Sequence, residues 1–177
     1  MRNILMIVSM ALLLGSCTSK LYVDAVYDES ADFSVFNTYD WALDQEPVKG
    51  DFPEFDNKEN RQRLQNAIDK EMQAIGFVKS TQSPDILVDF HVSIDEKVAY
   101  IDHSNYDFEY WEDYNPDVRP HVYKEGSLII HLVENKTEKL VWEGIGDKTL
   151  NNVPPKNVEE RMAKAVRSIL AKYPIKK

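Results

Sequence analysis

Cysteine is almost absent from this chain: Cys17 is the one cysteine among 177 residues. No disulfide can form within a single copy, so the fold must rest on its own core even in a compartment that permits disulfides. Basic residues are also scarce, with 21 lysines and arginines against 30 aspartates and glutamates and a net charge of −9. No basic stripe is present, which argues against nucleic acid as a partner and against electrostatic attraction to anionic lipid headgroups.

The sequence motifs of common enzymes are missing too. The chain has no phosphate-binding P-loop, dinucleotide fingerprint, nucleophile elbow or zinc-protease helix. If Cys17 carries lipid, no thiol nucleophile remains, and nothing selects one serine for a triad with a histidine and an acid. We therefore predict that the protein is not an enzyme and has no catalytic residues and no cofactor. A hydrolase is the third functional alternative.

The N-terminus, in contrast, has the parts of an export signal. Arg2 supplies a positive charge, and the stretch Ile4–Leu14 is apolar except for Ser9. About a dozen apolar residues suit the hydrophobic region of a secretory signal and are too few to span a bilayer. The sequence therefore indicates export rather than a membrane-spanning helix at this end.

Cys17 directly follows two small residues, Gly15 and Ser16, which give a peptidase access to the backbone. This arrangement resembles a lipobox, in which the cysteine thiol is acylated before the signal is removed. The alternative is an ordinary signal peptide followed by a chance cysteine. We predict lipid, including palmitate, on Cys17, and divide the chain into a signal peptide (1–16), a lipidated cysteine with a short tether (17–20) and one domain (21–177).

The residues after the cysteine indicate where the lipoprotein is sent. Thr18 stands where an aspartate often retains bacterial lipoproteins in the inner membrane. Ser19 to Val23 contain no acid, unlike the acidic tags that resemble surface-display signals in some Gram-negative groups. We expect a lipid anchor in the outer membrane, with the domain facing the periplasm.

Hydrophobic periodicity divides the domain into strands and helices. A first helix is expected from a cap at Asp56, with Glu59 in capping-box spacing, to a stop at Gly76, and a last helix from a cap pair, Asn157 and Glu160, to Pro174. Alternating apolar residues predict strands over 21–28, 32–43, 86–95, 124–134 and 139–150, with a turn at 135–138.

The alternation also assigns side chains to the core. Val35, Tyr39 and Trp41 share one parity of the second strand, and Leu140 and Trp142 are expected on the buried face of the last one. The order of elements is strand, strand, helix, a run of strands and a helix. It predicts an α+β two-layer sandwich, in which two helices cover one face of a mainly antiparallel sheet.

Residues 100–123 stand apart as a long connection with seven aromatic and six acidic residues. Exposed tyrosine and tryptophan rings beside carboxylates suit sugar rings or a protein partner. The alternative is that the rings pack over the open face of the sheet as a local lid. The candidate ligand-binding residues in this segment are Tyr106, Tyr110, Trp111 and Tyr114.

Histidines give two weak candidates for a metal site. His91 and His131 fall on adjacent antiparallel strands, on the parity opposite the core, so they are expected to lie close together, with Asp89 as a further candidate ligand. Two nitrogens without a third ligand make a poor zinc site, so we interpret them as imidazoles on a solvated sheet face and predict no metal. A second set lies towards the two ends of the 100–123 segment and lacks the spacing of a calcium-binding loop: Asp102, His103, Asp117 and His121.

Four stretches in this order resemble bacterial lipoproteins that carry the domain of unknown function 4136. They are Val23–Asp28 with Asp32-Phe33 and Thr38–Trp41, Pro84–Phe90, Glu125–Ile130 continued by Lys139–Gly144, and the last helix ending in Tyr173-Pro174. The resemblance implies an envelope lipoprotein domain with no assigned reaction and no catalytic residues to carry over. Members often have a glycine-rich stretch before Glu125-Gly126-Ser127, whereas residues 100–123 contain no glycine.

Together these features predict a non-enzymatic envelope lipoprotein with a binding or scaffolding role at the outer membrane. Its partners would be the membrane, through lipid on Cys17, and another envelope protein or a glycan. The first alternative is a glycan-binding module that uses the 100–123 segment.

Overall fold

The computed structural model describes residues 20–42, 52–102, 118–150 and 156–174. The predicted signal peptide, Cys17 and the four ring residues predicted to bind a ligand lie outside these ranges. Among the helices that the structure describes, none is long and apolar enough to cross a membrane.

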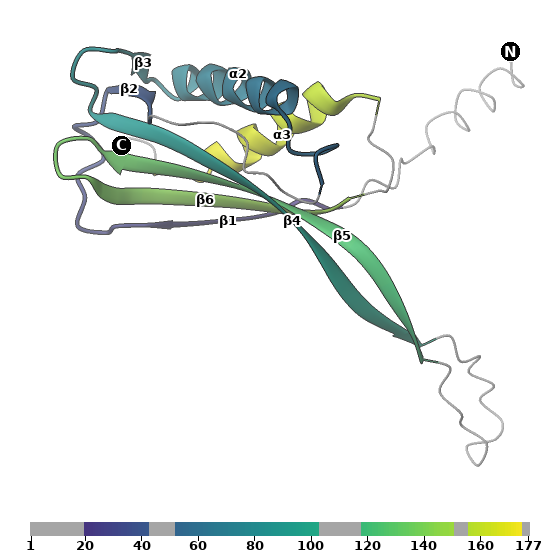
Figure 1. Cartoon of the computed structure of the whole chain (residues 1–177). Helices are drawn as coiled ribbons and strands as arrows, with labels where there is room; N and C mark the ends of the chain where they lie inside the picture. The colour runs from purple at the N-terminus through teal and green to yellow at the C-terminus, as the bar shows by residue number, and fades with distance from the viewer. Residues whose placement is uncertain (1–19, 43–51, 103–117, 151–155, 175–177) are drawn as a thin grey trace, which may run out of the picture.

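Within these ranges, six strands form one sheet in the order β1-β6-β5-β4-β2-β3 (Figure 1). Neighbours from β1 to β4 pair antiparallel, whereas β2 runs parallel to both β4 and β3. The sheet is therefore mixed but mainly antiparallel, as predicted. The strands are β1 (Tyr22–Tyr27), β2 (Thr38–Trp41), β3 (Val78–Lys79), β4 (Ile86–Asp102), β5 (Val118–Glu134) and β6 (Lys139–Leu150).

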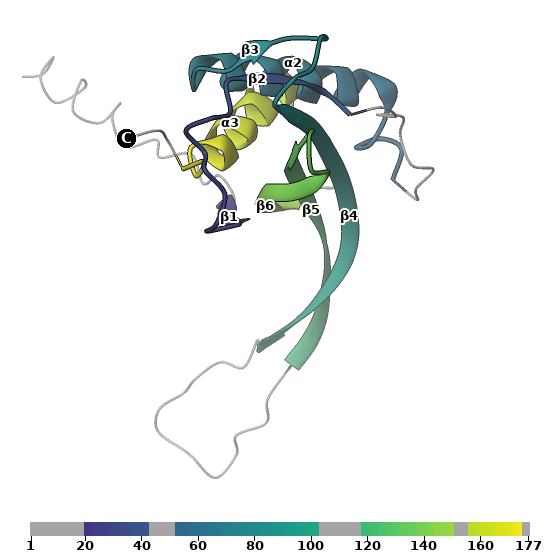
Figure 2. The same ribbon diagram turned by 90° about the vertical axis from the view of Figure 1, so that its left-hand side faces the viewer.

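Two helices, α2 (Lys58–Ala74) and α3 (Val158–Leu170), cover the same face of the sheet (Figures 1 and 2). α2 is the crossover between β2 and β3, which lets these two strands run parallel. Arg167 of α3 donates from Nε to Glu71 Oε1 of α2 at 3.0 Å and joins the helices. The predicted α+β two-layer sandwich is confirmed.

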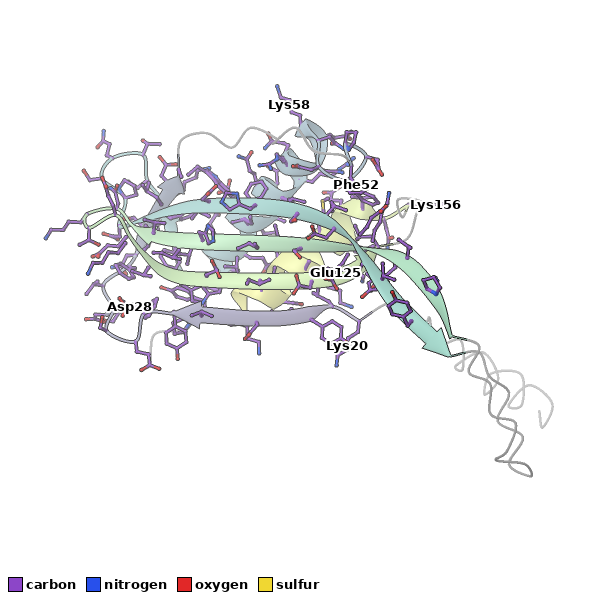
Figure 3. All side chains as sticks on the ribbon, turned by 60° about the horizontal axis from the view of Figure 1, so that its bottom comes forward. Lys20, Asp28, Phe52, Lys58, Glu125 and Lys156 are labelled. Atoms are coloured by element: carbon purple, nitrogen blue, oxygen red, sulfur yellow. The ribbon has the colours of Figure 1, made fainter. Side chains whose placement is uncertain are left out.

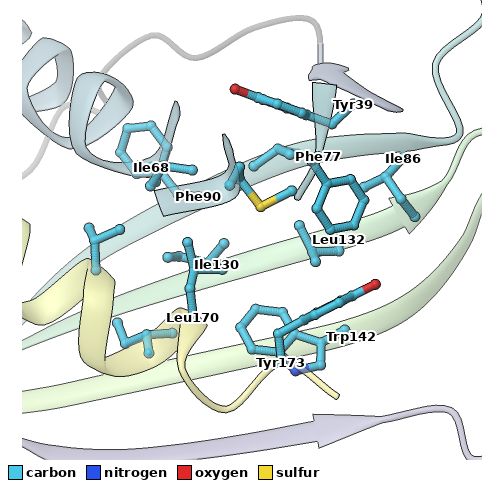
Figure 4. Close-up of a cluster of buried hydrophobic side chains, with 14 of the residues drawn as sticks. Tyr39, Ile68, Phe77, Ile86, Phe90, Ile130, Leu132, Trp142, Leu170 and Tyr173 are labelled. Atoms are coloured by element: carbon cyan, nitrogen blue, oxygen red, sulfur yellow. The ribbon is translucent and has the colours of Figure 1, made fainter. Parts of the chain in front are cut away.

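The core lies between the sheet and the two helices (Figure 4). Four aromatic rings, Tyr39, Phe77, Tyr173 and Trp142, form a chain of edge-to-face contacts through its centre, with centroids 5.6 to 6.3 Å apart. Each fully buried apolar side chain stabilises the fold by about 1.5–3 kcal/mol. Other fully buried members are Ile68, Met72, Ile86, Val88, Phe90, Ile130, Leu132, Val166, Ile169 and Leu170.

The second strand is shorter than predicted. Asp32 accepts hydrogen bonds from the N–H and the hydroxyl of Ser34 at 3.0 and 2.6 Å, and this local turn competes with strand geometry. Val35 is therefore 53% exposed and its core assignment is wrong, whereas Tyr39 is fully buried. Trp41 packs on the core but is only partly buried.

The first helix begins one residue later than predicted. Its N-cap is Asn57, whose side chain accepts a hydrogen bond from the Asn60 N–H at 2.9 Å. Asp56 instead binds Arg61 through both carboxylate oxygens, at 2.7 and 3.0 Å. The expected capping box of Asp56 and Glu59 is therefore wrong, because the arginine provides a stronger, charge-assisted partner.

The predicted stop of the first helix and the predicted start of the last helix are confirmed, whereas α3 ends at Leu170, with Ala171 as its C-cap, before the predicted stop at Pro174. Gly76 has a φ of +101°, the left-handed backbone that favours glycine after a helix. Asn157 is the N-cap of α3, but its side chain makes no capping hydrogen bond to the backbone. Its amide donates instead to Glu160 Oε2 at 3.1 Å, so the two predicted cap residues contact each other directly.

A bulge in the β5–β6 hairpin changes which side chains face the core. Leu132 pairs with Trp142 and Val133 with Leu140, so Val141 is the extra residue. Val141 is 3% exposed and Leu140 is 48% exposed. The predicted core position of Leu140 is therefore wrong, whereas that of Trp142 is confirmed.

β4 and β5 are much longer than predicted, with 17 residues each. β4 was expected to end at Asp95 and β5 to begin at Lys124, yet pairing continues until Asp102 lies opposite Val118. The predicted 100–123 connection is therefore wrong at both of its ends, which are strands. Residues 103–117 lie outside the described ranges.

Candidate functional site

The β4–β5 hairpin extends past the rest of the sheet as a two-stranded arm, residues 97–102 and 118–123. Among the residues that the structure describes, the pairing of β6 with β5 ends at Leu150, which lies opposite Lys124. Beyond that point, within the described ranges, β4 and β5 pair only with each other. Figures 1 and 2 show the arm projecting away from the helices.

Apolar side chains on the arm are open to solvent. Val98 and Val122 lie opposite each other and are 53% and 57% exposed, and Tyr100 is 73% exposed. All three share the parity of the sheet face that packs against the helices, and they lie beyond Glu96 and Lys124, which face each other at the root of the arm. On the other parity, the rings of His121 and Tyr123 stack with an interplanar angle of 18°.

Lys124 fixes the root of the arm to the segment before α2. Its Nζ lies 3.4 Å from Glu54 Oε1 and 4.2 Å from the centroid of the Phe52 ring. The Phe55 ring centroid is 5.8 Å from the same atom. A cation held between a carboxylate and aromatic faces is stabilised by both. The start of the arm is therefore tied to the domain.

An apolar cavity of about 180 Å³ lies near this root, between the sheet and the helices. Gly126 and Gly146 line it and leave room because they have no side chains. Lys148 also lines it; burial, and then the charges of Arg161 and Lys164, lower the pKa of this lysine. Small-molecule sites usually exceed about 300 Å³, so the cavity suits only a small apolar group. Its apolar lining includes Leu21, Phe55, Leu64, Val92, Ile94, Leu128, Leu150, Val158, Met162 and Ala165.

Two imidazoles and two carboxylates meet on the outer face of the sheet, the face that Figure 3 views with the helices behind. Asp89 of β4 lies opposite His131 of β5, which in turn lies opposite Glu143 of β6. His91 Nε2 is 3.0 Å from Asp89 Oδ2, and His131 Nε2 is 2.8 Å from Glu143 Oε2. The two imidazole centroids are 5.2 Å apart. The expected proximity of His91 and His131 is confirmed.

The remaining predicted site residues fall wholly or partly outside the described ranges. Tyr106, Tyr110, Trp111 and Tyr114 belong to the segment that follows the arm and lie outside the described ranges. Of the second histidine set, His121 lies on the arm and Asp102 ends β4, whereas His103 and Asp117 fall in the same undescribed segment.

Sequence reasoning missed Glu143 and the cavity. Glu143 lies beside His131 because of the bulge at Val141, and hydrophobic alternation gives no sign of a bulge that buries two successive apolar residues. A signal for the cavity was present: Gly126 and Gly146 occupy inward-facing strand positions where a side chain would otherwise fill the space.

Comparisons with known proteins identify a family and a fold. A family model with the description "Domain of unknown function (DUF4136)" matches residues 23–175. A search of curated proteins gave no significant match. Among solved structures, a PDZ domain protein from Parabacteroides distasonis is similar, with a TM-score of 0.56 and 13% identity. That alignment covers 90% of this chain but only 37% of the other, so it shows the fold alone.

PelC from Paraburkholderia phytofirmans, described as a dodecamer, also aligns with this chain. Two structures give TM-scores of 0.46 and 0.43 at 9% and 8% identity. The alignments cover 86% of this chain and 96% and 95% of PelC. These scores are too low to support a statement about assembly or function.

Proposed function

Since the chain belongs to the family described as "Domain of unknown function (DUF4136)", and that family name assigns no activity, we propose that it acts by binding rather than by catalysis. It is an envelope lipoprotein of the outer membrane that holds another envelope protein through its arm. The solvent-exposed apolar surface of the arm is the observation that supports this proposal.

The arm has the properties of a binding element. An isolated two-stranded hairpin is marginally stable in water, so a partner that covers it adds stability. Val98, Tyr100 and Val122 each expose more than half of their surface on one face. Covering such apolar area is favourable by about 25 cal/mol per Å². Strand edges that carry no neighbour also accept an added strand from a partner protein.

The proposed lipid anchor places this partner near the membrane. Lipid on Cys17, palmitate included, would hold the N-terminus in the outer membrane, and β1 begins at Tyr22. The tether of residues 17–20 spans at most about 14 Å when extended. The domain therefore stays close to the periplasmic side of the bilayer, where an outer-membrane protein is within reach of the arm.

The test replaces Val98 and Val122 together by serine in the full chain. Because both side chains are exposed, we expect the free energy of unfolding to change by no more than about 0.5 kcal/mol for each. Chemical crosslinking from Lys97, which lies on the arm, should identify a partner protein in intact cells. The yield of this crosslinked product should fall at least tenfold in the double variant.

A matched control keeps the same chemical change away from the arm. Val26 on β1 and Val78 on β3 are 65% and 64% exposed, so Val26→Ser with Val78→Ser removes two similar side chains from the two edge strands. This control should keep the crosslinked partner. Equal crosslinking in the arm variant and the control would refute the arm as the binding element.

Glycan binding is a second candidate, supported by the aromatic rings of the arm. Tyr100 is 73% exposed, and His121 and Tyr123 present a stacked pair on the opposite parity. Flat aromatic faces pack against sugar rings. A glycan array probed with the purified chain and its Tyr100→Ala and Tyr123→Ala variants distinguishes glycan binding from binding of an envelope protein. Only glycan binding requires a signal on the array that the variants lose.

A further inference from the structure

The outer-face cluster of Asp89, His91, His131 and Glu143 has no part in the function proposed above. We propose that Asp89, His91 and His131 bind a divalent transition-metal ion of the zinc class, and that Glu143 orients the imidazole of His131. Imidazole nitrogens and carboxylate oxygens are the ligands that zinc, nickel and copper share in proteins.

The distances suit such a site. One donor atom from each of Asp89, His91 and His131 lies within 4.8 Å of the other two. Donor atoms around a tetrahedral zinc ion, at about 2.0–2.2 Å from the metal, are about 3.4 Å apart. The donors must approach each other by up to about 1.4 Å, and the His91 side chain, which is 53% exposed, has room to rotate towards the other two.

Glu143 prepares His131 for metal binding. A carboxylate only accepts hydrogen bonds, so the 2.8 Å contact from Glu143 Oε2 places the proton of a neutral His131 on Nε2. The lone pair then lies on Nδ1, which is the form in which a histidine binds a metal. A carboxylate that holds the far nitrogen of a ligating histidine is a recurrent part of zinc sites.

The sheet also gives the site charge and rigidity. Asp89, His131 and Glu143 come from three adjacent, hydrogen-bonded strands, which fix their backbone positions in one row. The carboxylates of Asp89 and Glu143 supply negative charge on this part of the face, which a divalent cation balances. The side chains of Asp89, His131 and Glu143 are 22% to 30% exposed, so this row is partly sheltered from solvent. The His91 side chain is 53% exposed, which leaves room for a water molecule as a further ligand.

The chain's four histidines provide a matched experiment. The full chain, purified in detergent and stripped with a chelator, is titrated with ZnCl2 by calorimetry, and with Co²⁺ to record the visible absorption of a tetrahedral site. We expect one ion per chain. His91→Ala with His131→Ala should abolish binding, whereas His103→Ala with His121→Ala, which removes the other two imidazoles of the chain, should leave it unchanged.

Single variants separate ligands from the orienting group and guard against misfolding. His91→Gln changes a half-exposed side chain and should weaken zinc binding at least tenfold without changing the circular dichroism spectrum. Glu143→Gln should weaken it by about 10- to 100-fold and keep the tetrahedral cobalt spectrum, as loss of an orienting carboxylate does. Absence of zinc binding by the unaltered chain, or its loss only in the His103/His121 variant, would overturn the proposal.

Discussion

Thr38 and Asp85 bond to each other in both directions. The N–H and the hydroxyl of Thr38 both donate to Asp85 Oδ2 at 2.8 Å, and the Asp85 N–H donates to Thr38 Oγ1 at 3.0 Å. The Asn37 N–H donates to the same carboxylate oxygen at 2.9 Å. Asp85 therefore fixes the start of β2 beside the start of β4, where the two strands run parallel. Two stretches of the family resemblance, 38–41 and 84–90, meet at this contact.

The first prediction concerns Asp85. Replacing it by alanine leaves three donors around a partly buried position without their acceptor, so we expect the free energy of unfolding to fall by about 2–4 kcal/mol. Denaturant titration of the variant measures this loss. Asp24→Ala is the control, because Asp24 is exposed on β1 and, among the described residues, accepts one hydrogen bond, from the neighbouring Ala25 N–H at 2.9 Å. A similar loss in both variants would contradict the role of Asp85.

The second prediction concerns Gly144, which faces helix α3. A Cβ at this position would lie 2.5 Å from Ile169 Cγ2 and against the indole of the buried Trp142. Gly144→Ala should therefore cost about 3 kcal/mol of stability, the upper part of the usual range for overpacking. Gly126→Ala is the matched control, since its Cβ would meet the flexible Leu150 side chain at 2.9 Å. Thermal unfolding should show a clearly smaller loss in the control, and equal losses would argue against close packing of α3 on β6.

A third prediction follows from Tyr39 and Tyr173. Burial raises the pKa of both hydroxyls above the ordinary value of about 10, and for Tyr39 a hydrogen bond to Asp69 adds to the effect. The unfolded chain loses these protons near pH 10, whereas the folded chain keeps them. The stability they contribute is therefore complete below pH 10 and is lost as the pH rises towards the folded values.

Tyr173 allows this pH dependence to be tested. Its hydroxyl is buried and has no hydrogen-bond partner among the described residues, so Tyr173→Phe should preserve the fold at pH 7. Above pH 10 the variant should lose stability with roughly half the slope of the unaltered chain, because one of two protons no longer contributes. Tyr22→Phe, at an exposed position, should keep the original slope. An unchanged slope in Tyr173→Phe would count against this assignment.

Most of the fold could be predicted from the sequence, because apolar and polar residues alternate clearly in strands that bury only one face. Residues 86–94 alternate cleanly, and Val88 and Phe90 are almost completely buried as the alternation requires. β6 begins and ends at the predicted residues. The amphipathic stripe of α3 likewise gave its place on the sheet, because a helix of this kind must bury one face.

Alternation could not predict which strand residues are exposed where no helix covers the sheet. Along the arm, Val98 and Tyr100 keep the inward parity but are exposed, so alternation there does not indicate burial. The place of Glu143 in the outer-face cluster depends on the bulge at Val141. A regular hairpin with Glu134 opposite Lys139 places His131 opposite Trp142, and the extra residue Val141 brings Glu143 to that position instead.

The fourth prediction concerns the anchor. Cys17 is the protein's one cysteine, so it is the one site available for a thioether-linked lipid. Stable membrane anchoring requires two or more acyl chains. Cys17→Ser should therefore move the protein from the membrane fraction to the soluble fraction, measured by sedimentation after a high-salt wash. Ser16→Ala is the control, because it keeps a small residue before the cysteine and should leave the protein in the membrane. The net charge of −9 gives no attraction to anionic headgroups, so a Cys17→Ser protein that still sediments would have a different anchor, and the lipid assignment would be wrong.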